Sequence, residues 1–261
     1  MIKLFITDLD GCISTPFKSP DWEVLTEIRK LNNQHRTNET VPPLSICSGR
    51  PLSYVEAVGQ WLDISHPVGF ENAGIYTIPK NELLLLPGFD EGAEKEVHEL
   101  KAWLRSEVVP HYSDAMIEFT KKMDAGFIHP SKDVIDEVYP RVVKYVGRHY
   151  PRFEVHKTEV SVNTILKENN KKQGILKLCE LTGISPKETA YIGDSSGDIP
   201  GLEIVGYPFA PKNAVNEVKE HAQVLEKEVT NAVLEGYRRT IEINRALKRD
   251  EGGTADLIQN K

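Results

Sequence analysis

Runs of apolar residues near both ends of the chain alternate with stretches that are apolar on one side only. Lys3–Thr7 and Pro43–Cys47 are short apolar runs, and each is followed by a polar residue, Asp8 or Ser48. Strands that are buried on both faces of a parallel sheet have this nearly continuous apolar character. The pattern therefore predicts two buried parallel strands, each ending at a polar side chain.

The segments that follow these strands have the spacing of helices. After the start signal Ser19-Pro20-Asp21, apolar residues recur every three positions, which predicts a helix with one buried stripe. The stripe consists of Trp22, Leu25, Ile28 and Leu31. A second helix is predicted from Pro51, because proline is favoured in the first turn. Its inward side chains are Val55, Val58 and Leu62, and the next strand is predicted at Val68–Phe70.

The same alternation of strand and helix returns in the last third of the chain. Leu176 and Leu178–Leu181 form a helical pattern that ends at Gly183, and Thr189–Ile192 is an apolar run. We expect a further strand near 205–210, a helix over 213–222, a last amphipathic helix over 229–247 and a frayed polar tail after Lys248. This order predicts an α/β fold with a Rossmann-like parallel sheet.

The middle of the chain lacks this alternation. It contains two successive units of one helix and two strands, the first over 90–129 and the second over 132–164. Such units predict a small antiparallel sheet covered by two helices. We therefore assign residues 1–82 and 167–261 to a Rossmann-like core domain, and residues 83–166 to an inserted α+β domain.

The composition is that of an acidic globular protein, with 39% hydrophobic residues and 32 Lys and Arg against 39 Asp and Glu. The net charge of −7 argues against a nucleic-acid or anionic-membrane partner, so an anionic substrate would need a local cation. No apolar stretch approaches the roughly 18 residues of a membrane helix, and we expect a cytoplasmic protein. Cys12, Cys47 and Cys179 form no Cys-x-x-Cys pair, so neither a disulfide framework nor a zinc site is predicted.

Carboxylates follow two of the predicted strands. Asp8-Leu9-Asp10-Gly11 ends the first strand, and Gly193-Asp194-Ser195-Ser196-Gly197-Asp198 ends the strand at Thr189–Ile192. Ligands bind at the carboxyl ends of strands in an open α/β sheet. Two acids one residue apart can serve one reaction centre, one attacking while its neighbour moves a proton. Oxygen ligands at this density suit Mg²⁺, although each segment alone is also typical of a solvated or capped turn.

Two further segments have the chemistry to hold an anion. Ser48-Gly49-Arg50-Pro51 joins a strand to a helix start, where a hydroxyl and free backbone amides favour phosphate. Lys171 and Lys172 lie at the head of another predicted helix, where an ammonium can neutralise phosphate oxygens. An ordinary N-cap and a solvated helix start would explain each segment alone. All four segments together indicate one catalytic site for a phosphate group.

The four segments resemble the four motifs of the haloacid dehalogenase superfamily of phosphohydrolases, and the resemblance covers nearly the whole chain. The inserted doublet of helix-strand-strand units, together with Glu71-Asn72-Ala73-Gly74-Ile75-Tyr76, is similar to the Cof-type, IIB-capped sugar-phosphate phosphatases. In that family the sheet domain carries out the chemistry and the inserted domain is a cap that closes over the substrate. The resemblance therefore implies a Rossmann-like core with an α+β cap.

The resemblance also implies roles for individual residues. Asp8 resembles the nucleophile that forms an aspartyl-phosphate. Asp10 resembles the acid that protonates the leaving alcohol and then activates water. Ser48 and Gly49 of the second motif, together with Lys171, would hold the phosphoryl oxygens.

Magnesium would be bound by Asp8, by the backbone carbonyl of Asp10 and by Asp194. Asp198 would be either a further ligand or an anchor behind the ligands. This division fits the chemistry, because phosphoryl transfer depends mostly on positioning and on neutralising charge.

The sequence departs from the family pattern at three places. The usual lysine-glycine pair is absent from the third motif, and the family's spacing to Asp194 selects Lys171, with Lys172 as the alternative. Cys12 stands where the family commonly has Thr or Val. Gly197 stands where relatives of this group usually carry Asn, and the loss of that Asn bears on how Lys171 or the metal is held. Buried structural thiols are expected at Cys12 and at Cys47, with a redox-sensitive site as the alternative.

We expect a Mg²⁺-dependent phosphatase that acts on a small phosphorylated metabolite, most consistent with a sugar or polyol phosphate. Lys121, Lys122 and Asn163 of the inserted domain are candidates for substrate contacts, with solvated surface as the alternative for each. A phosphosugar mutase on the same scaffold remains open, because an aspartyl-phosphate can return its phosphoryl group to a sugar. A non-catalytic phospho-accepting domain or sugar-phosphate sensor also remains open.

Overall fold

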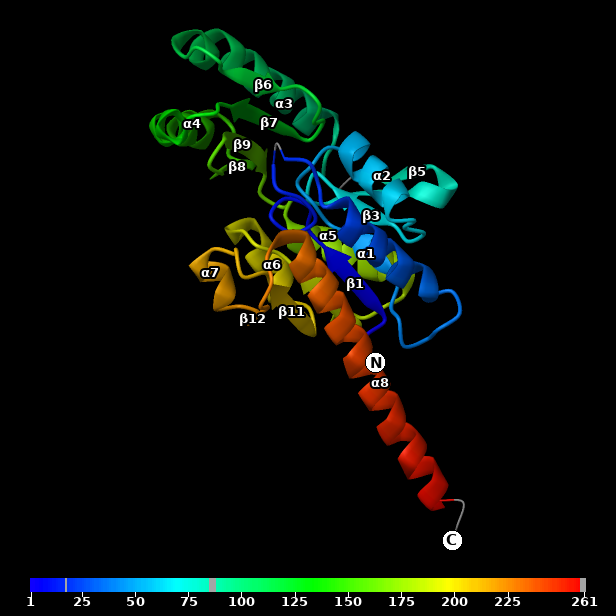
Figure 1. Cartoon of the computed structure of the whole chain (residues 1–261). Helices are drawn as coiled ribbons and strands as arrows, with labels where there is room; N and C mark the ends of the chain where they lie inside the picture. The colour runs from blue at the N-terminus through cyan, green and yellow to red at the C-terminus, as the bar shows by residue number, and fades with distance from the viewer. Residues whose placement is uncertain (17, 85–87, 259–261) are drawn as a thin grey trace. The chain divides into compact units, whose positions relative to one another are not determined.

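The structure is a computed structural model that describes residues 1–16, 18–84 and 88–258, with side chains described as far as residue 250. It divides into two compact units, of which the first comprises Met1–Leu84 and Asn170–Lys261 and the second comprises Leu85–Asn169. Along the chain, the second unit thus lies between the two segments of the first, as the colours of Figure 1 show. The chain passes between the units a few residues later than at the predicted positions 82/83 and 166/167.

A parallel sheet of five strands forms the centre of the first unit, in the order β12-β11-β10-β1-β2. The strands are β1 (Leu4–Thr7), β2 (Leu44–Ile46), β10 (Thr189–Ile192), β11 (Tyr207–Ala210) and β12 (Gln223–Val224). Neighbouring strands are parallel, as the alternation with helices predicts. Because β1 lies between β2 and β10, the polar residues that follow these three strands share one edge of the sheet.

A second, antiparallel sheet adjoins β2, and only its first strand is predicted by the pattern of apolar residues. It consists of β3 (Val68–Phe70), β4 (Gly74–Thr77) and β5 (Glu82–Leu84). A parallel bridge between Cys47 and Gly69 joins β3 to the end of β2. The Ser48 N–H donates to the Gly69 carbonyl at 3.1 Å, so the turn after β2 is tied to β3.

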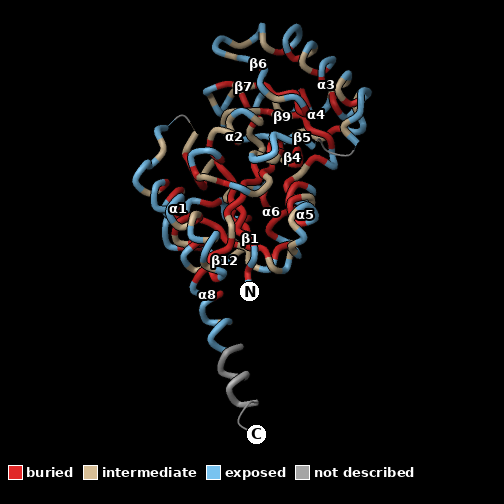
Figure 2. Tube along the Cα trace, turned by 90° about the vertical axis from the view of Figure 1, so that its right-hand side faces the viewer, coloured by how far each residue is buried: buried red, intermediate tan, exposed pale blue. Residues whose placement is uncertain are grey.

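Helices cover both faces of the parallel sheet, as alternating strand side chains require (Figure 1). Phe5 stacks on Tyr237 of α8, whereas Leu4 and Ile6 share a core cluster with Ile175 of α5. One face carries α1 (Trp22–Gln34), α2 (Leu52–Trp61) and α8 (Val229–Ile258), and the other carries α5 (Lys171–Thr182), α6 (Ile199–Leu202) and α7 (Asn216–Lys219). Figure 2 shows the buried positions of this unit concentrated along β1 and its neighbours.

Two details of the helix at 22–34 differ from the predicted buried stripe. Trp22 is 51% exposed and packs against Trp61 with 5.2 Å between ring centroids, and Leu31 is only partly buried. Asn32 is buried instead. Its side-chain nitrogen donates to the backbone carbonyls of Leu62 and Asp63, and its side-chain oxygen accepts the Leu44 N–H. A buried polar side chain thus satisfies three backbone groups on a helix for which the pattern predicted only apolar contacts.

Two predicted helix limits are also wrong. The segment at 213–222 contains only the single turn α7, because the chain first makes a turn in which the Ala214 N–H donates to the Pro211 carbonyl. The backbone of α8 continues to Ile258, beyond Lys248, where we expected the tail to fray. None of the helices in the described ranges combines the length and apolar character needed to cross a membrane.

The second unit contains an antiparallel sheet of four strands in the order β6-β7-β9-β8. The strands are β6 (Met116–Glu118), β7 (Asp124–Ile128), β8 (Phe153–Lys157) and β9 (Ser161–Leu166). The helices are α3 (Glu91–Trp103), extended by the π-helical turn η2 (Leu104–Val108), and α4 (Lys132–His149). Both helices share one apolar core with alternate residues of the strands, including Phe127 and Val162. This core leaves Asn163 and Gly126, which are paired in register, on the other face of the sheet.

Short helical turns join several of these elements. They are η1 (Ile78–Lys80), η3 (Val109–His111), η4 (Pro186–Glu188) and η5 (Ser196–Asp198). The turn η5 follows β10 directly and contains part of the fourth motif. Its local conformation therefore decides where Asp198 lies.

Asn244 of α8 fastens the start of the chain to the first unit. Its amide carbonyl accepts the Ile2 N–H at 2.6 Å, and its amide nitrogen donates to the carbonyls of Ile2 and Thr40 at 2.8 and 3.1 Å. The side chain is fully buried, so three backbone groups would lose their partner if it were removed.

We predict that Asn244→Ala lowers the free energy of unfolding by about 2–4 kcal/mol, because it leaves buried backbone groups unsatisfied. Urea unfolding followed by circular dichroism measures the change. Asn231→Ala on the same helix is the matched control, since Asn231 is exposed and its replacement should change stability by less than about 0.5 kcal/mol. Equal effects of the two substitutions would contradict this role of Asn244.

Candidate active site

The residues that the motifs singled out lie at the carboxyl ends of three neighbouring strands and at the start of α5. Two of these residues follow each strand: Asp8 and Asp10 follow β1, Ser48 and Gly49 follow β2, and Asp194 and Asp198 follow β10. Lys171 is the first residue of α5. The fold therefore brings together segments from both ends of the sequence. All of these residues belong to the first unit.

A buried ion pair between Asp8 and Lys171 forms the centre of this cluster. The Lys171 Nζ atom lies 2.8 Å from Asp8 Oδ2, and the two side chains are only 7% and 6% exposed. Lys172, the alternative from the sequence, is exposed. Asp8 Oδ1 has no hydrogen-bond partner in the described part of the chain. A buried carboxylate oxygen without a partner is unfavourable, so this atom is the natural position for a ligand.

Asp198 uses both of its oxygens to hold the site together. Oδ1 accepts hydrogen bonds from Lys171 Nζ and from the Tyr191 hydroxyl. Oδ2 accepts the backbone N–H groups of Asp194 and Ser195 at 3.0 and 2.9 Å and the Ser195 hydroxyl at 2.9 Å. Burial would raise the pKa of Asp198, but the Lys171 charge and these hydrogen bonds lower it. Asp198 therefore stays ionised and fixes both Lys171 and the loop after β10.

Asp194 lies against the backbone of the first motif. Gly11 has a φ of +71°, a conformation that favours glycine, and a Cβ built there would lie 1.9 Å from Asp194 Oδ2. Any side chain at position 11 would thus occupy the space of the Asp194 carboxylate. The turn Asp10-Gly11 and the loop after β10 can approach each other only because of this glycine.

Negative charge is in excess in this cluster. One oxygen from each of Asp8, Asp194 and Asp198 lies within 4.8 Å of the other two. Burial, reinforced by the neighbouring carboxylates, raises the pKa of Asp8 to about 6 and that of Asp194 to about 8. Burial opposes the charge of Lys171, but Asp198 and Asp8 raise its pKa well above the usual value. Three carboxylates against one ammonium, with a free oxygen on Asp8, fit a divalent cation such as Mg²⁺.

The turn after β2 presents Ser48 and Gly49 beside the loop that follows β3. The Asn72 N–H donates to the Ser48 carbonyl at 2.9 Å, and the Ser48 hydroxyl accepts the Arg50 N–H at 3.3 Å. Gly174 of α5 packs on the same loop, because a Cβ there would lie 2.1 Å from the Asn72 carbonyl oxygen. The loop at Asn72 thus joins the Ser48 turn to the helix that begins with Lys171.

Asp10 is paired with Arg50. Arg50 Nε donates to Asp10 Oδ2 at 2.6 Å and Nη2 donates to Oδ1 at 2.8 Å, so the guanidinium binds both carboxylate oxygens. The Arg50 guanidinium carbon lies 5.0 Å from the centre of the Tyr54 ring. The Asp10 side chain thus lies outside the group of carboxylates formed by Asp8, Asp194 and Asp198.

Sequence reasoning missed Tyr191 and gave Arg50 no role. Tyr191 is fully buried on β10, and burial with the nearby Asp198 charge raises the pKa of its hydroxyl well above the usual value, so it acts as a donor. A phenol within the apolar run Thr189–Ile192, just before Gly193-Asp194, was a usable signal. The partner of Arg50 had no signal in the sequence, because Asp10 lies 40 positions away.

The departures from the family pattern leave these contacts in place. Cys12 and Cys47 are buried; burial raises the pKa of Cys12 well above its usual value and that of Cys47 to about 12. Both thiols therefore stay protonated, which argues against the redox-sensitive alternative. Gly197 has only the Ser195 hydroxyl within 4 Å of its ideal Cβ position, at 3.8 Å. Lys171 is held by Asp8 and Asp198 without a side chain at position 197.

The three candidates in the inserted unit have local partners. Lys121 Nζ lies 2.7 Å from the buried Asp124 carboxylate, and Lys122 Nζ lies 3.5 Å from Glu94. Asn163 donates to the Ser161 hydroxyl at 2.8 Å. Asn163 stays on the sheet face that the helices leave uncovered.

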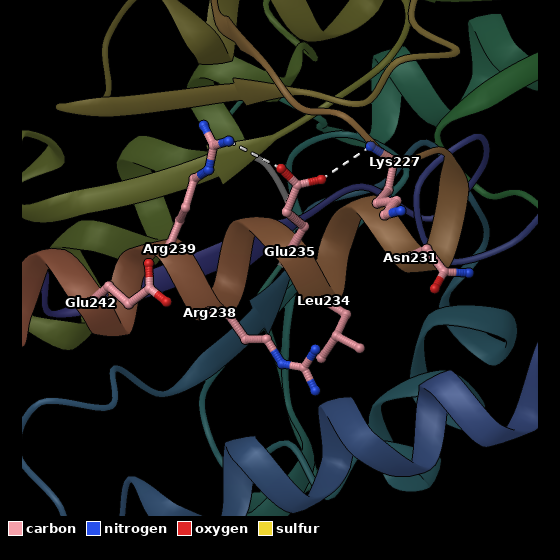
Figure 3. A pocket seen from close by; sticks show the side chains of 7 residues that line it. All are labelled: Lys227, Asn231, Leu234, Glu235, Arg238, Arg239 and Glu242. Atoms are coloured by element: carbon pink, nitrogen blue, oxygen red, sulfur yellow. Dashed lines mark hydrogen bonds and ion pairs between the residues drawn. The ribbon is translucent and has the colours of Figure 1, made fainter.

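A pocket of about 300 Å³ lies along α8 and contains none of the motif residues. Figure 3 shows its lining, in which Glu235 accepts hydrogen bonds from Arg239 and from the Lys227 backbone. Arg238 pairs with Glu27 at 2.7 Å. Its lining contains three basic and two acidic side chains and no close group of carboxylates, so this pocket lacks the chemistry of the cluster at Asp8.

We predict that Asp194→Asn stabilises the metal-free protein at high pH. The pKa of Asp194 is raised on folding, so the unfolded chain releases this proton first and stability falls as the pH rises from about 4 to about 8. In EDTA, the variant should exceed the wild type by about 2 kcal/mol or more at pH 9 and by much less at pH 5. Urea unfolding at the two pH values measures the difference.

Asp63→Asn is the control, because Asp63 forms a half-exposed pair with Arg36. Its effect should stay below about 1 kcal/mol at both pH values. Mg²⁺ should stabilise the wild type more than Asp194→Asn. The same stability difference at pH 5 and pH 9 would show that the Asp194 carboxylate is not under strain from its neighbours.

Comparisons with known proteins show relatives of this chain in sequence and in fold. The chain is 28% identical over 236 residues to a phosphoglycolate phosphatase of Methanopyrus kandleri, which covers 86% of this chain and 90% of the relative. Its fold is similar to that of a haloacid dehalogenase-like hydrolase from Bacteroides thetaiotaomicron, with a TM-score of 0.64, 16% identity and coverage of 92% of this chain and 99% of the other. The fold is also similar to that of a sucrose-phosphatase from Synechocystis, solved with sucrose and phosphate. The TM-score is 0.62, the identity is 17%, and the match covers 92% of this chain and 98% of the other.

A family model also matches, over residues 105–235, which is half of the chain. Its description is that of a haloacid dehalogenase-like hydrolase. The fold, the motif residues around Asp8 and this match lead to one assignment. The chain belongs to the haloacid dehalogenase-like hydrolase family.

Proposed function

We propose that this hydrolase is a Mg²⁺-dependent phosphatase that acts on a small phosphorylated metabolite through an aspartyl-phosphate at Asp8. The observation that carries the proposal is the Asp8 carboxylate, which is buried, held through Oδ2 by Lys171 and without a partner at Oδ1. Relatives named phosphoglycolate phosphatase and a structural neighbour named sucrose-phosphatase support a phosphoric monoester as substrate. Sugar, polyol and short-acid phosphates are the candidate classes.

In the first half of the reaction, the Asp8 carboxylate attacks phosphorus and the bond from phosphorus to the ester oxygen breaks. The leaving oxygen takes a proton from the Asp10 carboxyl group and departs as an alcohol. The phosphoryl group is then bonded to an Asp8 oxygen. A covalent route is useful because phosphate monoesters hydrolyse extremely slowly in water.

In the second half, water attacks the phosphorus of the aspartyl-phosphate and gives a proton to Asp10. The bond from phosphorus to the Asp8 oxygen breaks, which releases phosphate and restores both carboxyl groups to their starting states. Asp10 thus acts first as an acid and then as a base. Its side chain is 38% exposed, and both of its oxygens accept hydrogen bonds from Arg50.

Lys171, Ser48 and the Gly49 backbone would hold the phosphoryl oxygens. Lys171 is suited to this role because Asp8 and Asp198 fix its ammonium group and keep it charged. Mg²⁺, bound by Asp8, Asp194 and the Asp10 carbonyl, would neutralise charge on the phosphoryl group. Asp198 fits the role of anchor better than that of ligand, since both of its oxygens already accept hydrogen bonds.

We further propose that the first unit is the catalytic core and that the inserted unit acts as a cap that contributes to the choice of substrate. The sheet face of this unit that lacks helices carries polar side chains, among them Asn163 and its register partner His156. Polar side chains on a sheet can hydrogen-bond hydroxyl groups of a sugar or polyol.

We predict that the wild type releases phosphate from one or more of the sugar, polyol and short-acid phosphates in a panel, and that EDTA stops the release. Asp8→Asn should reduce kcat by at least about 1,000-fold, because the amide cannot form the acyl phosphate. Asp63→Asn is the matched control and should keep wild-type activity. Isomerised sugar phosphate without free phosphate would favour a mutase, and stable binding without turnover would favour a sensor; either result contradicts the proposal.

The two adjacent lysines provide a second test. We predict that Lys171→Met lowers kcat/KM by about 100-fold or more, because the phosphoryl charge loses a buried cation. Lys172→Met should change kcat/KM less than about threefold, since the exposed Lys172 does not contact Asp8. Folding of both variants is checked by circular dichroism. A larger loss from Lys172→Met than from Lys171→Met would exclude the proposed phosphate site.

A further inference from the structure

The pairing of Asp10 with Arg50 is at odds with the role of Asp10 in the proposed reaction. Both Asp10 oxygens accept N–H groups of Arg50, at 2.6 and 2.8 Å. A carboxyl group that delivers a proton must turn an oxygen toward the leaving oxygen. The two hydrogen bonds from Arg50 fix the orientation of the Asp10 carboxylate, and the loss of one or both would free Asp10 to turn toward a substrate.

Arg50 is placed so that it can change partners. Its backbone is fixed, because its N–H donates to the Ser48 hydroxyl at 3.3 Å and its carbonyl accepts the Glu71 N–H at 2.9 Å. Its side chain is 31% exposed and can be reached from solvent. The Tyr54 ring, whose hydroxyl lies 3.2 Å from the Ser14 hydroxyl, supports the guanidinium from one side. A charged group is thus held beside the proposed phosphate-binding turn, partly exposed to solvent, with the Asp10 carboxylate on its Nε–Nη2 edge.

We propose that Arg50 recognises a second anionic group of the substrate, a carboxylate a few bonds from the phosphate ester, and releases Asp10 when it does so. This inference rests on the proposed phosphatase function and assigns the substrate to the short phosphorylated carboxylic acids. The planar fork of arginine binds carboxylates through two parallel hydrogen bonds, and in this structure it already binds one in that way.

The exchange favours acids over neutral alcohols for a simple reason. A substrate carboxylate can replace the Asp10 carboxylate with little net change in charge pairing. A neutral hydroxyl offers the guanidinium one weak contact in place of two charge-assisted ones, so the Arg50–Asp10 pair persists. The same arginine would then select the substrate and make the proton-transferring residue available only when that substrate is present.

The test compares phosphoglycolate with hydroxyethyl phosphate, which has the same length but ends in a hydroxyl group. For Arg50→Gln, the ratio of kcat/KM for the acid to kcat/KM for the alcohol should fall roughly 10- to 150-fold, the range of a charge-assisted pair. Arg50→Lys should restore the ratio only in part, because an ammonium lacks the fork. The matched control is Arg36→Gln, which breaks another pair with an aspartate, at 3.1 Å, and should leave the ratio unchanged.

An equal loss for both substrates would overturn the inference, because it would make Arg50 only a support for Asp10. A wild type that prefers the alcohol would overturn it as well. A different result would contradict the phosphatase proposal itself: the wild type would then release no phosphate from any substrate of the wider panel.

Binding gives a second readout that does not require turnover. In the Asp8→Asn background, calorimetry should show that Arg50→Gln weakens the binding of phosphoglycolate roughly 10-fold or more but weakens that of inorganic phosphate much less. Equal weakening of both ligands would exclude recognition of the carboxylate.

Discussion

The charge of the buried Lys171 ammonium is the constraint on which the rest of the site depends. It lies between Asp8 and Asp198, at 2.8 Å from the first, in a region where almost no solvent reaches either side chain. Without it, the carboxylates of Asp8, Asp194 and Asp198 would lie within 4.8 Å of one another with no compensating charge from α5. Lys171 thus keeps Asp8 available as an anion while Asp198 keeps Lys171 in place, and the chemistry of each depends on the other.

One ammonium does not balance three carboxylates, and the pKa values of Asp8 and Asp194 are raised to about 6 and about 8. This imbalance opposes folding of the metal-free chain. In the proposed function, a divalent cation would compensate it and would also neutralise charge on the phosphoryl group. Sites that stabilise charge in a transition state are organised before the substrate arrives. The strands and glycine contacts of the first unit hold the acids in this unfavourable proximity.

Much of the first unit could be predicted from the sequence, because apolar runs such as Thr189–Ile192 become strands with the same bounds. The motif spacing likewise predicted that Asp8, Ser48 and Asp194 follow neighbouring strands. Side-chain partners that depend on the tertiary fold could not be predicted in this way. Examples are the buried Asn32, which satisfies backbone groups of distant segments, and the pairing of Arg50 with Asp10. The strand Glu82–Leu84 was missed because no apolar alternation marks it and its side chains are exposed.

The aspartyl-phosphate mechanism can be tested by finding where the phosphoryl group resides during turnover. Wild-type protein is mixed with its best substrate and Mg²⁺, quenched in acid within one turnover and digested for mass spectrometry. We expect a single phosphoryl group on the peptide that contains Asp8, at the Asp8 side chain, and this group should disappear as free phosphate forms. Rapid release of phosphate with no phosphorylated Asp8 at any time, or with the group on another residue, would contradict this mechanism.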